Sequence, residues 1–164
     1  SSGAASSYVA GAMMGNPMGA ATAAQKMPLI NTDVTWAQIE EVVGIERAAG
    51  FSRESSTQQA AWCAYGLSKA GLTAYAMLLA RLHPKLVVSS CSPGFINTKM
   101  TAGFGAKLQP KDGTISLKHC LFNELGGNGW YFGSDGVRSP LHVMRNPGEP
   151  AYDGEPGSAG EPAW

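Results

Sequence analysis

A tyrosine and a lysine lie four positions apart in the stretch AYGLSKAG, as Tyr65 and Lys69. On a helix, residues at this spacing share a face, so a lysine ammonium can lie close to a tyrosine hydroxyl. An ordinary tyrosine has a pKa of about 10, but a positive charge at about 4 Å contributes about 4 kcal/mol at an effective dielectric of 20 and favours the phenolate. Such a pair can exchange a proton near neutral pH. The same spacing also occurs on buried helices without any chemical role.

The elements around the pair are predicted from periodicity and end signals. The pair lies in a predicted helix over about 60–82, which Pro84 ends. This helix is apolar nearly all round, so we expect it to be buried on most sides. An earlier helix over 35–49 begins with the capping-box pattern of Thr35 and Gln38.

Two predicted strands and a further helix follow the long helix. The segment 85–91 is rich in β-branched residues and is followed by Pro-Gly, a pattern typical of a buried parallel strand. A helix is predicted over 112–125 and an aromatic strand within 128–136. Helix, strand, helix and strand in this order predict an α/β fold.

Composition and charge exclude several classes of protein. Hydrophobic residues make up 44% of the 164 residues and charged residues 15%, which is typical of one globular domain. Lysine plus arginine and aspartate plus glutamate number 12 each, so no charge excess favours nucleic acid or an anionic membrane. No apolar run is long enough to span a membrane, and no secretory signal pattern is present. We therefore expect a cytoplasmic protein without a nucleic-acid or membrane partner.

The cysteines and histidines do not predict a metal site. Three widely spaced cysteines indicate a reducing compartment and small packed side chains rather than a disulfide scaffold. The histidines have no cysteine or carboxylate at ligand spacing and are expected to be packing or surface residues. These six residues are Cys63, Cys91, Cys120, His83, His119 and His142.

The end of the chain differs in composition. Gly-Glu-Pro recurs every six residues from Gly148, without the glycine at every third position that a collagen helix needs. We therefore expect 146–164 to be a disordered tail.

Together, these motifs resemble the short-chain dehydrogenase/reductase family. In that family Tyr-x-x-x-Lys lies in a long helix, and the following strand ends in Pro-Gly with an apolar residue and a threonine beyond. Tyr65, Lys69 and the segment SPGFINTKM at 92–100 match this pattern, and Ser-Ser-Gly at 1–3 matches the turn that carries the catalytic serine. The matches cover about 1–140 in the family's order.

The resemblance implies a role for each matching residue. Tyr65 would exchange a proton with the substrate oxygen, Ser2 would hydrogen-bond that oxygen, and Lys69 would assist the tyrosine and bind the nicotinamide ribose. Phe95 and the loop 99–110 would line the carbonyl pocket. The remaining expected cofactor contacts are Pro93, Gly94, Ile96 and Thr98.

One departure from the family pattern points to a subgroup. Ser2 and Tyr65 are separated by a long insertion, about 4–59, which is similar to that of the monomeric carbonyl reductases. The resemblance then implies NADP as cofactor, a carbonyl or alcohol substrate, and a monomer for the full-length protein. The family's Gly-rich turn and catalytic asparagine have no counterpart here. We therefore expect 1–145 to be an incomplete, C-terminal part of a doubly wound, Rossmann-like domain with a helical insertion, in a truncated chain that is inactive or unstable alone.

Alternatives to this enzyme remain open. A non-catalytic half-domain that binds or completes another chain is the main one. An epimerase or dehydratase with the same pair fits less well, because such relatives carry a larger substrate domain. The sequence leaves the substrate, the reaction direction and the choice between NAD and NADP undetermined.

Overall fold

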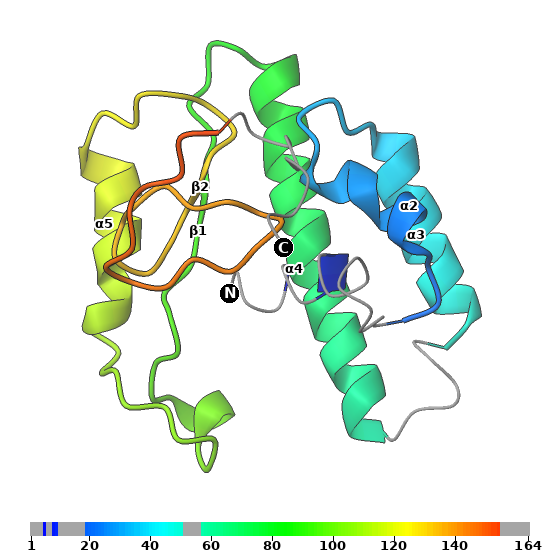
Figure 1. Ribbon diagram of the computed structural model, residues 1–164, viewed down its shortest axis with the longest axis horizontal. Helices are drawn as coiled ribbons and strands as arrows, with labels where there is room; N and C mark the ends of the chain where they lie inside the picture. Colours follow the sequence, from blue (N-terminus) through cyan, green and yellow to red (C-terminus); the bar gives the residue numbers. More distant parts are fainter. Residues whose placement is uncertain (1–4, 6–7, 10–18, 51–56, 155–164) are drawn as a thin grey trace.

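The computed structural model describes residue 5, residues 8–9, residues 19–50 and residues 57–154. A long central helix, α4, separates a group of short helices from a small sheet with its own helix (Figure 1). The elements on the first side are α2 (Ala23–Lys26), η1 (Met27–Ile30) and α3 (Trp36–Ala48), and α4 is Thr57–Leu82. The elements on the other side are β1 (Ser90–Cys91), η2 (Lys99–Thr101), η3 (Asp112–Thr114), α5 (Ile115–Phe122) and β2 (Tyr131–Phe132).

The predicted helical starts and stops are confirmed for α3 and for the end of α4. The Thr35 hydroxyl accepts the Gln38 backbone N–H at 3.3 Å, and the Gln38 side chain accepts the Thr35 N–H at 2.9 Å. This reciprocal pair satisfies two amides that have no partner within the helix. Helix α4 ends at Leu82, two residues before Pro84, as the sequence predicts.

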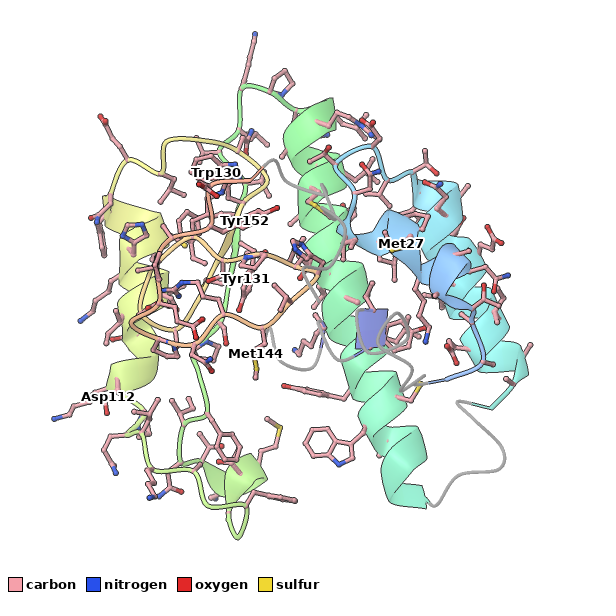
Figure 2. The ribbon with its side chains drawn as sticks, in the orientation of Figure 1. Met27, Asp112, Trp130, Tyr131, Met144 and Tyr152 are labelled. Atoms are coloured by element: carbon pink, nitrogen blue, oxygen red, sulfur yellow. The ribbon has the colours of Figure 1, made fainter. Side chains whose placement is uncertain are left out.

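The hydrophobic core lies between α4 and the short helices. One face of α4 supplies a row of buried side chains spaced three or four residues apart, which meets apolar residues of η1 and α3. Met27 marks this helical side of α4, opposite the strands (Figure 2). The α4 residues of the core are Cys63, Leu67, Ala70, Ala74, Met77 and Leu78.

A buried polar cluster lies inside this helical core. The Glu46 carboxylate accepts hydrogen bonds from the Tyr8 hydroxyl at 2.7 Å and from the amides of Ala20 and Ala21 at 2.8 and 3.1 Å. Lys26 Nζ lies 3.9 Å from the same carboxylate, and both side chains are fully buried. Burial lowers the pKa of Lys26, whereas burial and the adjacent carboxylate raise the pKa of Tyr8. The cluster joins the segment before α2 to α3.

The sheet has two short parallel strands. Ser90 pairs with Tyr131 and Cys91 with Phe132, and the amides of Ser90 and Ser92 donate to the opposite strand at 3.0 Å. The predicted strand 85–91 is therefore shorter than expected. The side chain of Asn128 replaces the ladder there: it accepts the Val88 N–H at 2.7 Å and donates to the Leu86 carbonyl at 2.7 Å.

The other edge of β2 is covered by the chain that follows it. Gly136, with φ 76°, turns the chain back so that the Ser139 amide donates to the Tyr131 carbonyl at 2.8 Å. The edge of β1 and of the segment that leads into it has no partner among the described residues: the amides of Val87 and Ser89, just before β1, make no hydrogen bond there.

The first part of the predicted tail is built into this side of the molecule. The Tyr152 amide donates to the Arg138 carbonyl at 3.0 Å, and the Arg138 guanidinium lies 3.8 Å from the centre of the Trp130 ring. Figure 2 shows Trp130 and Tyr152 beside each other near the strands. Arg138 donates to the Gly154 carbonyl, and Arg145 donates to the Glu149 carbonyl. Residues 155–164, the rest of the expected tail, lie outside the described part of the chain, and the disorder of the tail stays a prediction.

The described residues form a mixed helix and parallel-sheet architecture, which agrees with the α/β prediction at that coarse level. Within the described ranges, none of the helices has both the length and the apolar character needed to cross a bilayer.

Candidate functional site

A cavity of about 940 Å³ lies between α4 and the chain that leaves β1. This volume is at the upper end of the range for small-molecule sites. Most of its described wall comes from α4, the end of β1, the turn and loop after β1, and β2 with the loop beyond it. The polar or charged side chains of the wall are Tyr65, Lys69, Thr73, Ser90, Thr98, Thr101 and Tyr131.

Tyr65 and Lys69 both face this cavity from α4. Lys69 Nζ lies 5.3 Å from the centre of the Tyr65 ring, and both side chains are half-buried. The helical spacing therefore brings the two side chains together, with the ammonium over the ring. Trp62, close to one turn before Tyr65, packs edge-on against its ring at 6.1 Å. This contact limits the rotation of the tyrosine.

The turn after β1 forms the opposite wall and is fixed internally. The Gly94 amide donates to the Ser92 hydroxyl at 3.1 Å, and the Thr101 hydroxyl donates to the Ile96 carbonyl at 2.6 Å. Gly94 has φ 78°, and a Cβ there would lie 2.8 Å from the Ser134 side chain. Glycine is thus required for the turn. Further along, the Thr98 amide donates to the Thr101 hydroxyl at 2.9 Å.

All of the residues predicted in this turn line the cavity: Pro93, Gly94, Phe95, Ile96 and Thr98. The expected pocket loop 99–110 contributes Met100, Thr101 and Phe104. Ser2 lies outside the described residues. Ala5, three positions after Ser2, is described, is buried and lines the cavity.

Much of the cavity's rim is apolar and open to solvent. Half or more of the side chain is exposed at Leu72, Phe95, Met100 and Phe104, and Trp62 is nearly as open. Large exposed apolar side chains around a concavity are typical of a binding site rather than of ordinary surface.

Ser90 is a candidate that the sequence analysis did not single out. Its hydroxyl lines the cavity and is buried, yet it has no hydrogen-bond partner among the described residues. A buried hydroxyl without a partner costs free energy unless a ligand or water satisfies it. Strand alternation separates the side chain of Ser90 from those of its two neighbours, and this alternation is the only signal the sequence offers.

Cys63, His119 and His142, which the sequence predicts to be packing or surface residues, do not line the cavity. Cys63 is buried, with Sγ 3.8 Å from a Glu46 oxygen, and burial raises the pKa of its thiol to about 11. His119 packs against Phe132 at 5.1 Å, and His142 against Tyr152 at 5.6 Å. No group of three metal-ligating side chains occurs within the described ranges.

No protein-family model matches this chain, and no curated protein matches its sequence. The chemistry of the cavity therefore has to be inferred from its own side chains.

Proposed function

We propose that this chain is the catalytic part of an NADP-dependent oxidoreductase of the short-chain dehydrogenase/reductase type, acting on a carbonyl or alcohol group. The observation that carries the proposal is the shared cavity: the half-buried Tyr65 and Lys69 face the wall formed by the turn 93–98. A phenol and an ammonium held together in a large, mostly apolar cavity can exchange a proton with a polarised substrate oxygen.

Each side chain has a separate task in this proposal. Tyr65 donates its proton to a carbonyl oxygen during reduction, or accepts one from an alcohol during oxidation. Lys69 stabilises the negative charge that develops as the tyrosine gives up its proton, because the ammonium lies over the ring. The unsatisfied Ser90 hydroxyl, together with Ser2 as the resemblance implies, donates a hydrogen bond to the same substrate oxygen.

The described residues fit one end of a nicotinamide cofactor. Lys69 and Thr98 line the cavity and can hydrogen-bond ribose or phosphate oxygens, while Ile96 offers an apolar wall for a flat ring. When bound, the nicotinamide would supply or accept the hydride. The described residues include no Gly-rich turn at a helix N-terminus, so none of them forms the usual binding site for the cofactor's pyrophosphate.

The proposal is tested by NADPH oxidation with a panel of aldehydes, aromatic ketones and quinones. The longest natural form of the protein that can be expressed is compared with its Tyr65→Phe and Lys69→Met variants. Loss of a general acid reduces turnover by about 10²–10⁴-fold, so Tyr65→Phe should be close to inactive. Lys69→Met should lose turnover and also bind NADPH more weakly.

Tyr75→Phe is the matched control. Tyr75 lies on the same helix, packs against Trp36 at 5.8 Å and is absent from the cavity wall, so turnover should not change. Turnover that survives Tyr65→Phe, or an absence of turnover with every carbonyl and every length of the protein, contradicts the proposal.

A second candidate is a half-domain that completes the sheet of another chain. The open edge of β1 supports it, because the Val87 and Ser89 amides have no hydrogen-bond partner among the described residues, and Leu86 and Val87 are largely exposed. It predicts that these two amides become protected from hydrogen exchange in an assembled state, while NADPH has no effect on that protection.

A further inference from the structure

Two cysteine thiols meet between the sheet and α5. Cys91 in β1 and Cys120 in α5 are both half-buried and reduced. The side chains of Cys91 and Ser89 are neighbours of the Cys120 thiol. The two cysteines are far apart in the sequence, so only the fold brings them together.

The register of α5 on β1 gives an independent reason for this meeting. The Ser116 hydroxyl donates to the Ser92 carbonyl at 2.6 Å, which fixes the start of α5 beside the end of β1. Helix α5 then runs in the direction opposite to β1 (Figure 1). From Ser116 to Cys120 the helix rises about 6 Å, which two strand residues also span. Cys120 is therefore level with Ser90.

Side-chain alternation then selects the partners of Cys120. Side chains alternate along a strand, so those of Ser89 and Cys91 lie on one face and that of Ser90 on the other. Ser89 and Cys91 are the two that neighbour Cys120 of α5. Ser116 and Cys120 share a face of α5, because they are four residues apart. Cys120 thus lies between Ser89 and Cys91 by register alone.

We propose that Cys91 and Cys120 are an oxidation site that forms a reversible disulfide, with hydrogen peroxide as the oxidant. One thiolate attacks the peroxide, the O–O bond breaks, and the products are a sulfenic acid and hydroxide, which takes up a proton to become water. The second thiol displaces the sulfenic hydroxyl as a second water, and the S–S bond forms. Two thiols are oxidised and one peroxide is reduced.

The disulfide would close a loop that contains the outer wall of the cavity. Residues 93–104, which include the turn with Gly94 and the aromatic rim, lie between the two cysteines in the chain. Oxidation would tie both ends of this wall to each other and reduce its freedom in the unfolded chain. None of this depends on the proposed oxidoreductase activity.

The third cysteine serves as an internal control. Cys63 is 1% exposed and is packed against the Glu46 carboxylate on the far side of α4. Burial also raises the pKa of the Cys120 thiol, so disulfide formation should accelerate as the pH rises from 7 to about 9. The pairing of Cys91 with Cys120 follows from the register of α5 on β1 and not from this titration.

The test is treatment of the whole chain with one equivalent of hydrogen peroxide, alkylation of the remaining thiols, and tryptic peptide mapping. Trypsin places Cys91 in peptide 86–99, Cys120 in 119–138 and Cys63 in 54–69. The expected product is a linked 86–99 and 119–138 pair in a monomer, with 54–69 alkylated, and dithiothreitol should restore both thiols. Peptides 86–99 and 119–138 found alkylated, over-oxidised or linked to any other cysteine overturn the proposal.

The Cys120→Ser variant separates this linkage from general oxidation. Serine keeps a small side chain that can still hydrogen-bond Ser89, so the fold should survive. Peroxide should raise the midpoint of thermal unfolding of the original protein, reversibly with dithiothreitol, and leave that of Cys120→Ser unchanged. An equal shift in both proteins contradicts closure of the loop.

Discussion

At the residue scale, Glu46 connects several parts of the helical core. Its carboxylate accepts hydrogen bonds from the Tyr8 hydroxyl and two backbone amides, and it pairs with the Lys26 ammonium. The sequence analysis missed this cluster because charged residues are usually solvated. A signal was nevertheless present. Glu46 follows Ile39 and Val42 at helical spacing, so it lies on the buried face of α3.

Removing the Glu46 carboxylate should strongly lower the free energy of unfolding. Glu46→Ala removes the acceptor of the Tyr8 hydroxyl and of the Ala20 and Ala21 amides. Breaking a buried charge pair typically lowers the free energy of unfolding by about 3–5 kcal/mol. Urea denaturation followed by circular dichroism measures the loss. Glu40→Ala, on the exposed face of the same helix, should change stability by less than about 0.5 kcal/mol. Equal effects of the two substitutions would refute the role given to Glu46.

The loop after β2 depends on a different carboxylate. The Arg145 guanidinium donates to both oxygens of Asp135 at 3.0 and 2.7 Å, and the Gly148 amide donates at 3.1 Å. The Arg145 hydrogen bonds lower the pKa of Asp135 from 3.8 to about 2. Because the folded pKa is depressed, the stabilisation is complete above the unfolded pKa and is lost as the pH falls toward 2.

The Asp135→Asn substitution should therefore reduce the free energy of unfolding by about 2 kcal/mol at pH 7. The difference between the two proteins should shrink between pH 5 and pH 2, as measured by urea denaturation across that range. The exposed Asp153→Asn is the control and should show no such convergence. A constant difference at every pH would mean that the carboxylate charge has no part in holding this loop.

At the element scale, the sequence predicted helices better than strands, for a physical reason. Helix signals are local: Thr35 and Gln38 cap their own turn, and Pro84 cannot continue α4. Strand length depends on a distant partner. The strand expected over 85–91 shortens to two residues because the Asn128 side chain takes the hydrogen bonds at Val88 and Leu86.

The candidate site also combines features with a local sequence signal and features that depend on distant contacts. The Tyr65 and Lys69 pairing follows from helical spacing, and the cavity wall at Pro93–Thr98 follows from a turn motif. Ser90 could not be predicted, because its unsatisfied hydroxyl depends on which strand face meets α4. The same holds for the meeting of Cys91 and Cys120.

Two glycine-to-alanine substitutions should change the free energy of unfolding in opposite directions. Gly44 is exposed on α3, and no neighbouring atom lies within 4 Å of the place that an alanine Cβ would take. Gly44→Ala should therefore raise the free energy of unfolding by about 0.5–1 kcal/mol. At Gly94, an alanine would have to adopt a positive φ, and its Cβ would collide with the Ser134 side chain. Gly94→Ala should therefore lower the free energy of unfolding by about 1–3 kcal/mol. Thermal and urea denaturation measure both, and a neutral Gly94→Ala would show that the turn is not held in this conformation.

At the scale of the whole molecule, the open edge of β1 lies among large exposed apolar side chains. Val87 is 73% exposed and Leu86 is 56% exposed. An unpaired edge beside apolar side chains favours pairing with another chain. We expect concentration-dependent self-association of the chain in the form described by the structure.

Val87→Lys should weaken that association, because a charged side chain on a strand edge opposes edge-to-edge pairing. Sedimentation velocity over a range of protein concentrations would show a shift toward monomer. Val43→Lys, at an exposed position on α3, adds the same charge away from the edge and should leave the association unchanged. Equal effects of both lysines would point to net charge and away from the β1 edge.

The central claim is that Tyr65 and Lys69 in their shared cavity support hydride transfer to a carbonyl. The most direct measurement uses NADPH deuterated at the transferring position and mass spectrometry of the alcohol product. The account predicts deuterium on the former carbonyl carbon with the original protein and with Tyr75→Phe, and none above background with Tyr65→Phe. Unlabelled alcohol, or equal labelling by the Tyr65→Phe variant, would contradict it.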